Sequence, residues 1–226
     1  MRTAAHLVPV SVLAFVGLAL GGATAAAQGN AAHTHIGHVM DGFGDTPDGQ
    51  GLLPTALAEA KIAAQHAALA AENPNNLQAM KRHAEHVLNA VDPSEQDNGP
   101  GLGYGVKQAA AGIAQHIELA AKSDGASQGV MTHAEHVATS ANNTVRRADT
   151  LIALAKAIET LPGSVSPESP PAALALVNQL STVAEQLITG VDANGDGQIG
   201  WQQGEGGLEQ AEQHMNLMKK GEGLGC

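Results

Sequence analysis

The sequence has few aromatic residues, a single cysteine and few basic residues. Only four of the 226 residues are Phe, Trp or Tyr, and Cys226 is the one cysteine. Runs of β-branched and aromatic residues that favour strands are missing, which excludes an all-β fold. A lone cysteine excludes an internal disulfide and a thiolate metal cluster. The small apolar residues that remain recur at helical spacing, so the sequence predicts an all-α fold.

Basic residues are outnumbered by acidic ones. Eleven Lys and Arg face 22 Asp and Glu, which gives a net charge of −11. A nucleic-acid binder neutralises phosphates with clustered cations, and an anionic membrane surface attracts basic segments. Both partners are therefore disfavoured, whereas bound cations are favoured.

Residues 1–27 have the pattern of a secretory signal peptide. Arg2 precedes an apolar stretch from Leu7 to Leu20, and the small residues Ala25 to Ala27 offer a cleavage site. The alternative, an uncleaved anchor helix, is disfavoured because the run is short and Gly21 and Gly22 follow it. We therefore expect an exported protein, periplasmic or secreted, with no membrane span after cleavage. In such an oxidising compartment Cys226 would link two chains through a disulfide.

Histidine is abundant, with 11 in the chain, and it recurs in an internal repeat of about 50 residues. In each full copy a Gln-His dipeptide precedes a His-x-x-His pair, whose members follow it by 17 and 20 positions. A partial copy upstream has the pair alone. The residues are His66, His83 and His86 in one copy, His116, His133 and His136 in the next, and His35 and His38 in the partial copy.

Apolar periodicity predicts helices over residues 54–72, 77–91, 104–122, 127–161, 172–190 and 208–220. Turns are expected at 73–76 and 123–125, and four prolines make 162–171 a linker. Residues 28–161 are then a four-helix bundle built from two repeated antiparallel hairpins. Residues 172–226 form a smaller helical appendage.

The two turns predict which histidines meet. In an antiparallel hairpin, residues equidistant from the turn lie at the same height along the helix axes. The midpoint between each Gln-His and the first histidine of the following His-x-x-His falls in one of the two turns. We therefore expect His66 across from His83 and His116 across from His133, with His86 and His136 as third ligands. Three imidazoles suit Zn²⁺ or Cu²⁺. The alternative is that duplication copied surface histidines that bind nothing.

Residues 192–203 resemble the calcium loop of the EF-hand family. Asp192, Asn194 and Asp196 occupy loop positions 1, 3 and 5, Gly197 stands at the sharp turn, and Ile199 is the apolar residue at position 8. The resemblance implies calcium held by these three side chains and the Gln198 carbonyl, between two helices. The family's bidentate Glu at position 12 is replaced by Gln203, and Glu205 follows. Either Gln203 or Glu205 would complete the coordination shell of the calcium ion, and we expect the affinity for calcium to be weak.

Catalytic signatures are missing. The chain has no Glu-x-x-His, His-Glu-x-x-His, phosphate-binding P-loop or Gly-x-Ser-x-Gly motif. We therefore expect a non-enzymatic metal-binding protein, with calcium in the C-terminal loop and Zn²⁺ or Cu²⁺ on the repeated histidines, that handles or buffers metal. One alternative is a structural or interaction protein that calcium only stabilises. Another is an electron carrier with b-type haem, which the scarcity of aromatic residues disfavours.

Overall fold

The computed structural model describes residues 30–163 and 171–225, and within these ranges it is all-helical. The all-α prediction is confirmed. The signal segment, most of the predicted linker and Cys226 lie outside the described residues. No described helix combines the length and the apolar character needed to cross a membrane. The elements are α1 (Ala31–Met40), the 3₁₀ turn η1 (Pro47–Gly49), α2 (Leu52–Ala71), α3 (Leu77–Val91), α4 (Val106–Lys122), α5 (Gln128–Glu159), α6 (Pro171–Thr189) and α7 (Leu208–Gly221).

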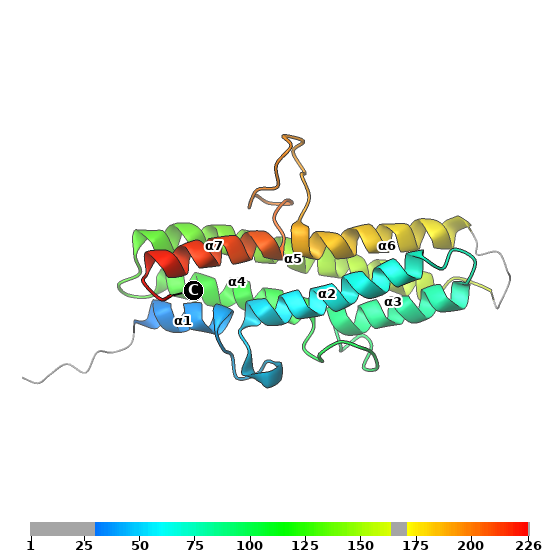
Figure 1. Ribbon diagram of the computed structural model, residues 1–226, viewed down its shortest axis with the longest axis horizontal. Coiled ribbons are helices and arrows are strands. Elements are labelled where there is room, and N and C mark those ends of the chain that lie inside the picture. The colour runs from blue at the N-terminus through cyan, green and yellow to red at the C-terminus, as the bar shows by residue number, and fades with distance from the viewer. Residues whose placement is uncertain (1–29, 164–170, 226) are drawn as a thin grey trace, which may run out of the picture.

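The helices form one elongated bundle around α5 (Figure 1). With 32 residues α5 is about 48 Å long, so it serves both halves of the bundle. One half contains α1, α4 and α7, and the other contains α2, α3 and α6. Helix α5 contacts α4 and α7 in the first half and α3 and α6 in the second, whereas α1 packs mainly on α4, and α2 packs mainly on α3 and α6. The predicted hairpins are present, because α2 packs on α3 and α4 packs on α5.

Two features of this architecture differ from the sequence prediction. Helices α6 and α7 are part of the bundle, where they follow one another along the same edge (Figure 1), rather than an appendage. Helix α6 packs on the bundle because it has an apolar stripe that is buried against α2 and α5. The stripe consists of Ala173, Val177, Leu180, Ala184 and Leu187. The partial repeat around His35 also forms a helix, α1, to which sequence analysis had assigned no helix.

Side-chain caps define where three of the helices begin. Asn30 accepts a hydrogen bond from the backbone N–H of Ala32, and Asn76 accepts one from Ala79, both at 3.0 Å. The Ser127 hydroxyl accepts one from Val130 at 3.0 Å. These caps satisfy N–H groups that the first turn of a helix leaves without partners. They place the turns before α3 and α5 where the sequence predicted them.

Two long loops are anchored to helices by buried polar side chains. The fully buried carboxylate of Glu59 in α2 accepts hydrogen bonds from the backbone N–H groups of Leu102, Tyr104 and Gly105, at 2.9–3.0 Å. Arg147 in α5 donates to the carbonyls of Gly204 and Gly206 at 2.7 and 2.8 Å. Burial lowers the pKa of Arg147 to about 10, so its guanidinium stays charged at neutral pH. Each loop therefore has a fixed position on the bundle.

Replacing Glu59 by Ala tests this anchoring. The change leaves three N–H groups of the 92–105 loop without their acceptor, so we expect the free energy of unfolding to fall by about 3 kcal/mol. Urea unfolding followed by circular dichroism measures it. Glu118→Ala is the matched control, because Glu118 is exposed and forms only a helical ion pair with Lys122. Its cost should stay below about 0.5 kcal/mol. Equal costs for the two variants would contradict the anchoring role.

Candidate metal centre

Nine histidines gather into three groups, each made by a His-x-x-His pair on one helix and one histidine on a neighbouring helix. In every group the three ring nitrogens lie within 4.8 Å of one another, and all nine side chains are half-buried. Triad 1 joins α1 to α4, triad 2 joins α3 to α2, and triad 3 joins α5 to α7. Their members are His35, His38 and His116 in triad 1, His83, His86 and His66 in triad 2, and His133, His136 and His214 in triad 3.

The three triads share one geometry. The single histidine is central, and its Nδ1 faces the Nδ1 atoms of both members of the pair. These Nδ1···Nδ1 distances are 3.0 and 3.3 Å in triad 1, 3.1 and 3.2 Å in triad 2, and 3.1 and 3.3 Å in triad 3. In each triad the central ring is tilted by 32–43° to one partner and stands nearly edge-on, at 70–84°, to the other.

This geometry suits a metal ion better than hydrogen bonding alone. The Nδ1 of a neutral imidazole has either one proton or one lone pair, so the central Nδ1 can make one well-directed hydrogen bond but not one to each partner. A cation accepts all three lone pairs at once. Tetrahedral zinc bonds of 2.0–2.1 Å place two ligand nitrogens about 3.3 Å apart, close to the distances in the triads.

Burial keeps these imidazoles in the neutral form that binds metal. It is the main cause that lowers the pKa of six triad histidines, and the charge of neighbouring groups in the triad lowers the pKa further. The effect is largest for His214, whose pKa falls to about 4 because of burial and then His136 and His133. The other five are His35, His66, His83, His116 and His136. Near pH 7 these six rings therefore present lone pairs rather than positive charge.

Two of the few aromatic residues lie against triads. Phe43 stands edge-on to His38 and His116 of triad 1, with ring centroids 5.5 and 5.0 Å apart. The Trp201 indole stacks on His136 of triad 3 at 4.0 Å and an angle of 20°. Triad 2 has no such neighbour within the described ranges. Aromatic contacts therefore distinguish triads 1 and 3 from triad 2.

The prediction that histidines face one another across each hairpin is confirmed for α2 and α3 and is wrong for α4 and α5. His66 lies across from His83, with His86 as the third member, as predicted. His116, however, meets His35 and His38 of α1 and not His133. The turn fixes the height of a residue along a hairpin but not the direction in which it points around the helix axis. Because α4 packs on both α1 and α5, His116 has a second helix to face.

Sequence analysis missed His214, the central member of triad 3. Its signal is a third Gln-His dipeptide, Gln213-His214, outside the 50-residue period. A second signal is the separation along the chain. His35 precedes His116 by 81 residues, and His133 precedes His214 by the same 81 residues.

The predicted calcium ligands lie in the loop between α6 and α7, whose two ends are joined by a backbone hydrogen bond. The Val191 N–H donates to the Glu205 carbonyl at 3.1 Å, and Gly190, with φ of 80°, leaves no room there for a side chain. Inside the loop, carboxylate and amide oxygens accept backbone N–H groups, and the Gln198 N–H is one of these donors. Asp192 bonds the N–H groups of residues 195–197, Asn194 that of Asp196, and Asp196 that of Gln198. The Glu205 carboxylate, which is buried, accepts the Gly200 N–H at 2.9 Å.

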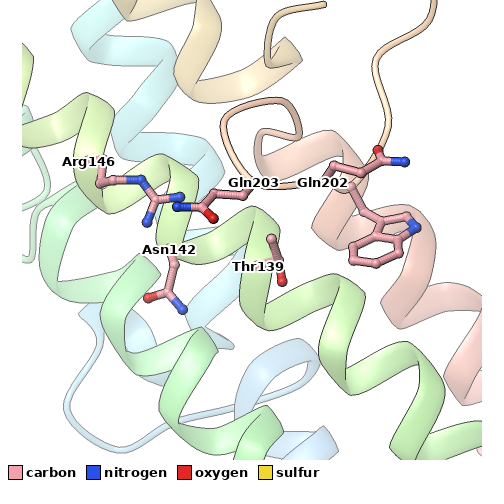
Figure 2. Close-up of a pocket in the computed structure, with 6 residues that line it drawn as sticks. Thr139, Asn142, Arg146, Gln202 and Gln203 are labelled. Atoms are coloured by element: carbon pink, nitrogen blue, oxygen red, sulfur yellow. The ribbon is translucent and has the colours of Figure 1, made fainter. Parts of the chain in front are cut away.

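The loop and α5 together line an open pocket of about 350 Å³ beside triad 3 (Figure 2). Trp201, which stacks on His136, forms one wall, and Thr139, Asn142, Arg146, Gln202 and Gln203 complete the lining. Gln203 points toward Arg146. The predicted position-12 ligand thus belongs to the lining of this pocket.

Comparison with protein-family models, curated proteins and solved structures finds no match for this chain.

The lowered pKa of His214 predicts how acid affects the metal-free protein. An imidazole that titrates at about 4 in the folded state and near 6.5 in the unfolded state takes up its proton more readily when unfolded. Its stabilising contribution is complete above about pH 6.5 and is lost as the pH falls toward 4. In EDTA, the free energy of unfolding of His214→Gln should therefore depend less steeply on pH than that of the wild type.

Gln213→Ala is the matched control, because Gln213 is the exposed neighbour of His214 on α7 and has no ionisable group. It should keep the wild-type slope between pH 7 and 4.5. Parallel curves for wild type and His214→Gln would show that burial in triad 3 does not disfavour the charged imidazole.

Proposed function

We propose that this chain is an exported, non-enzymatic metal-binding protein that holds a transition-metal ion at each of three histidine triads and serves to handle or buffer that metal. The observation that carries the proposal is the repeated convergence of three Nδ1 atoms with the same distances in three places. Nine of the 11 histidines are used in this way. A net charge of −11 gives the protein an overall attraction for cations.

The ligand type indicates the metals. Imidazole is a borderline ligand that suits Zn²⁺ and Cu²⁺, whereas Ca²⁺ and Mg²⁺ prefer oxygen. Structural zinc sites are usually closed by four protein ligands. In the described part of the chain each group consists of three histidines without a fourth Cys, Asp or Glu. A coordination position left to solvent allows the ion to exchange. Such exchange suits a protein that handles or buffers metal better than it suits a permanent structural site.

The alternatives are less well supported. Haem iron takes its axial ligands on opposite faces of a porphyrin, but the triad rings lie against each other with centroids 4.4–6.0 Å apart. No porphyrin fits between them. A purely structural or interaction role explains the bundle but not the threefold recurrence of the Nδ1 geometry.

Zinc stoichiometry tests the proposal. We expect the protein to retain three Zn²⁺ ions at pH 7.5 and to release them as acid protonates the imidazoles. Replacing His116, the centre of triad 1, by Gln removes one ligand of three and should reduce the count to two. Native mass spectrometry with elemental analysis measures both numbers.

The control for this measurement is His33→Gln, which lies outside the triads and should retain three ions. Zinc that leaves on desalting, or that His116→Gln retains in full, would argue against the triads as metal sites. Repeating the titration with Cu²⁺ distinguishes the two candidate metals by affinity.

We propose in addition that the loop over residues 192–205 binds calcium, as its resemblance to the EF-hand implies. Supporting this, the Asp192 and Asn194 side chains both accept a hydrogen bond from the Asp196 N–H. The Asp196 carboxylate accepts one from the Gln198 N–H in the same loop. The flanking helices α6 and α7 end and begin on either side of the loop, at Thr189 and Leu208. Glu205, already directed toward Gly200, is the acidic residue placed to compensate for Gln203.

Calorimetry tests the calcium site. We expect a dissociation constant of about 10⁻⁴ to 10⁻³ M, because the bidentate Glu at position 12 is missing. Asp192→Ala and Asp196→Ala should each abolish measurable binding, whereas Asp124→Ala, in the exposed turn before α5, should not change it. Calcium uptake that neither loop substitution affects would show that the loop is an Asx-rich turn without an ion.

A further inference from the structure

The three triads differ in the parts of the fold that they connect. Triad 2 lies within the α2–α3 hairpin, where its histidines are 17 and 20 residues apart. Triads 1 and 3 each join helices whose histidines are 81 and 78 residues apart. Triad 1 connects α1, and triad 3 connects α7, to the α4–α5 hairpin. These are the first and the last helices described.

Helix α1 has little else to hold it in place. It has ten residues, of which Ala32, Ile36 and Val39 are buried. Isolated helices shorter than about 12–15 residues are marginal in water, so α1 depends on its packing against α4. Helix α7 has 14 residues and packs mainly on α5.

Two polar contacts join the ends of these two terminal helices. Lys219 of α7, whose side chain is 10% exposed, lies 2.7 Å from Asp41 just after α1, and His33 of α1 lies 2.8 Å from Glu222 just after α7. Apart from these contacts, the two helices pack far more extensively on α4 and α5 than on each other. Each terminal helix is therefore held chiefly by the hairpin helix that carries the other part of its triad.

We infer that metal at triads 1 and 3 docks α1 and α7 onto the α4–α5 hairpin, so that loading these two sites controls the packing of both terminal helices. Triad 2 is loaded without such a change, because a short turn already joins its two helices. An ion that binds only the docked form stabilises that form by mass action. This inference rests on the proposed function, since it requires that the triads bind metal.

Hydrogen exchange measured by mass spectrometry on the intact protein tests this coupling. With free Zn²⁺ at ten times its dissociation constant, exchange in α1 and α7 should be about tenfold slower than in EDTA. Exchange in α3 should change less. His116→Gln should abolish the zinc effect on α1 while leaving that on α7. This variant is informative because the substitution lies in α4 and the readout lies in another helix.

Two matched variants complete the design. His133→Gln, in α5, should abolish the zinc effect on α7 and leave that on α1. His66→Gln removes the centre of triad 2 and should leave both effects unchanged. Any variant whose circular dichroism in EDTA differs from wild type is replaced by the corresponding His→Asn substitution.

The outcomes separate the two proposals. If the protein retains no zinc, the proposed function fails. If it retains three ions but α1 and α7 exchange at the same rate with zinc and with EDTA, only the docking inference is overturned. The same holds if His116→Gln leaves the zinc protection of α1 intact.

Discussion

Each triad depends on two neighbouring helices whose packed faces orient the histidines at their edge. The residue that follows every triad histidine is buried: Ile36, Val39, Ala67, Ala84, Val87, Ile117, Ala134, Val137 and Met215. These apolar side chains fix how each helix is rotated against its neighbour. The histidine one position earlier then lies at the margin of the core, and small residues such as Ala67 and Ala84 let the backbones approach. The metal geometry is thus a consequence of core packing.

A position at the core margin also determines the chemistry of the ligands. Partial burial lowers the pKa of six of the imidazoles, and so favours the form that donates a lone pair. Deeper burial would leave no route for the ion, and full exposure would leave the rings free to turn apart. Half-buried rings keep both the lone pair and the access to solvent.

The sequence allowed every described α-helix except α1 (Ala31–Met40), and one triad, to be predicted, because these depend on local patterns. Apolar periodicity located the helix over 77–91 without error, and the short turn before it fixed the height of His66 relative to His83. The rotation of α4 could not be predicted in this way, because it depends on which helix packs on its far side. That helix, α1, is separated from α4 by 65 residues of chain, from Asp41 to Gly105. His214 was missed for a related reason, since its Gln-His dipeptide falls outside the repeat period.

Convergence in space is stronger evidence for the triads than repetition in sequence. Duplication of a 50-residue unit would copy a surface histidine as readily as a ligand, so the recurrence of His-x-x-His alone decides nothing. Copying at that period does not account for His214, which follows His116 by 214 − 116 = 98 residues, with α5 and α6 between them. Yet it meets His133 and His136 with the same Nδ1 geometry as the other two centres. In triad 1 the pair belongs to the partial copy of the repeat and its centre, His116, to the second full copy. The ligands are 17 and 20 residues apart in triad 2 but 81 and 78 residues apart in triads 1 and 3. All three sites nevertheless share the same Nδ1 arrangement, and that shared arrangement is what a metal ion requires.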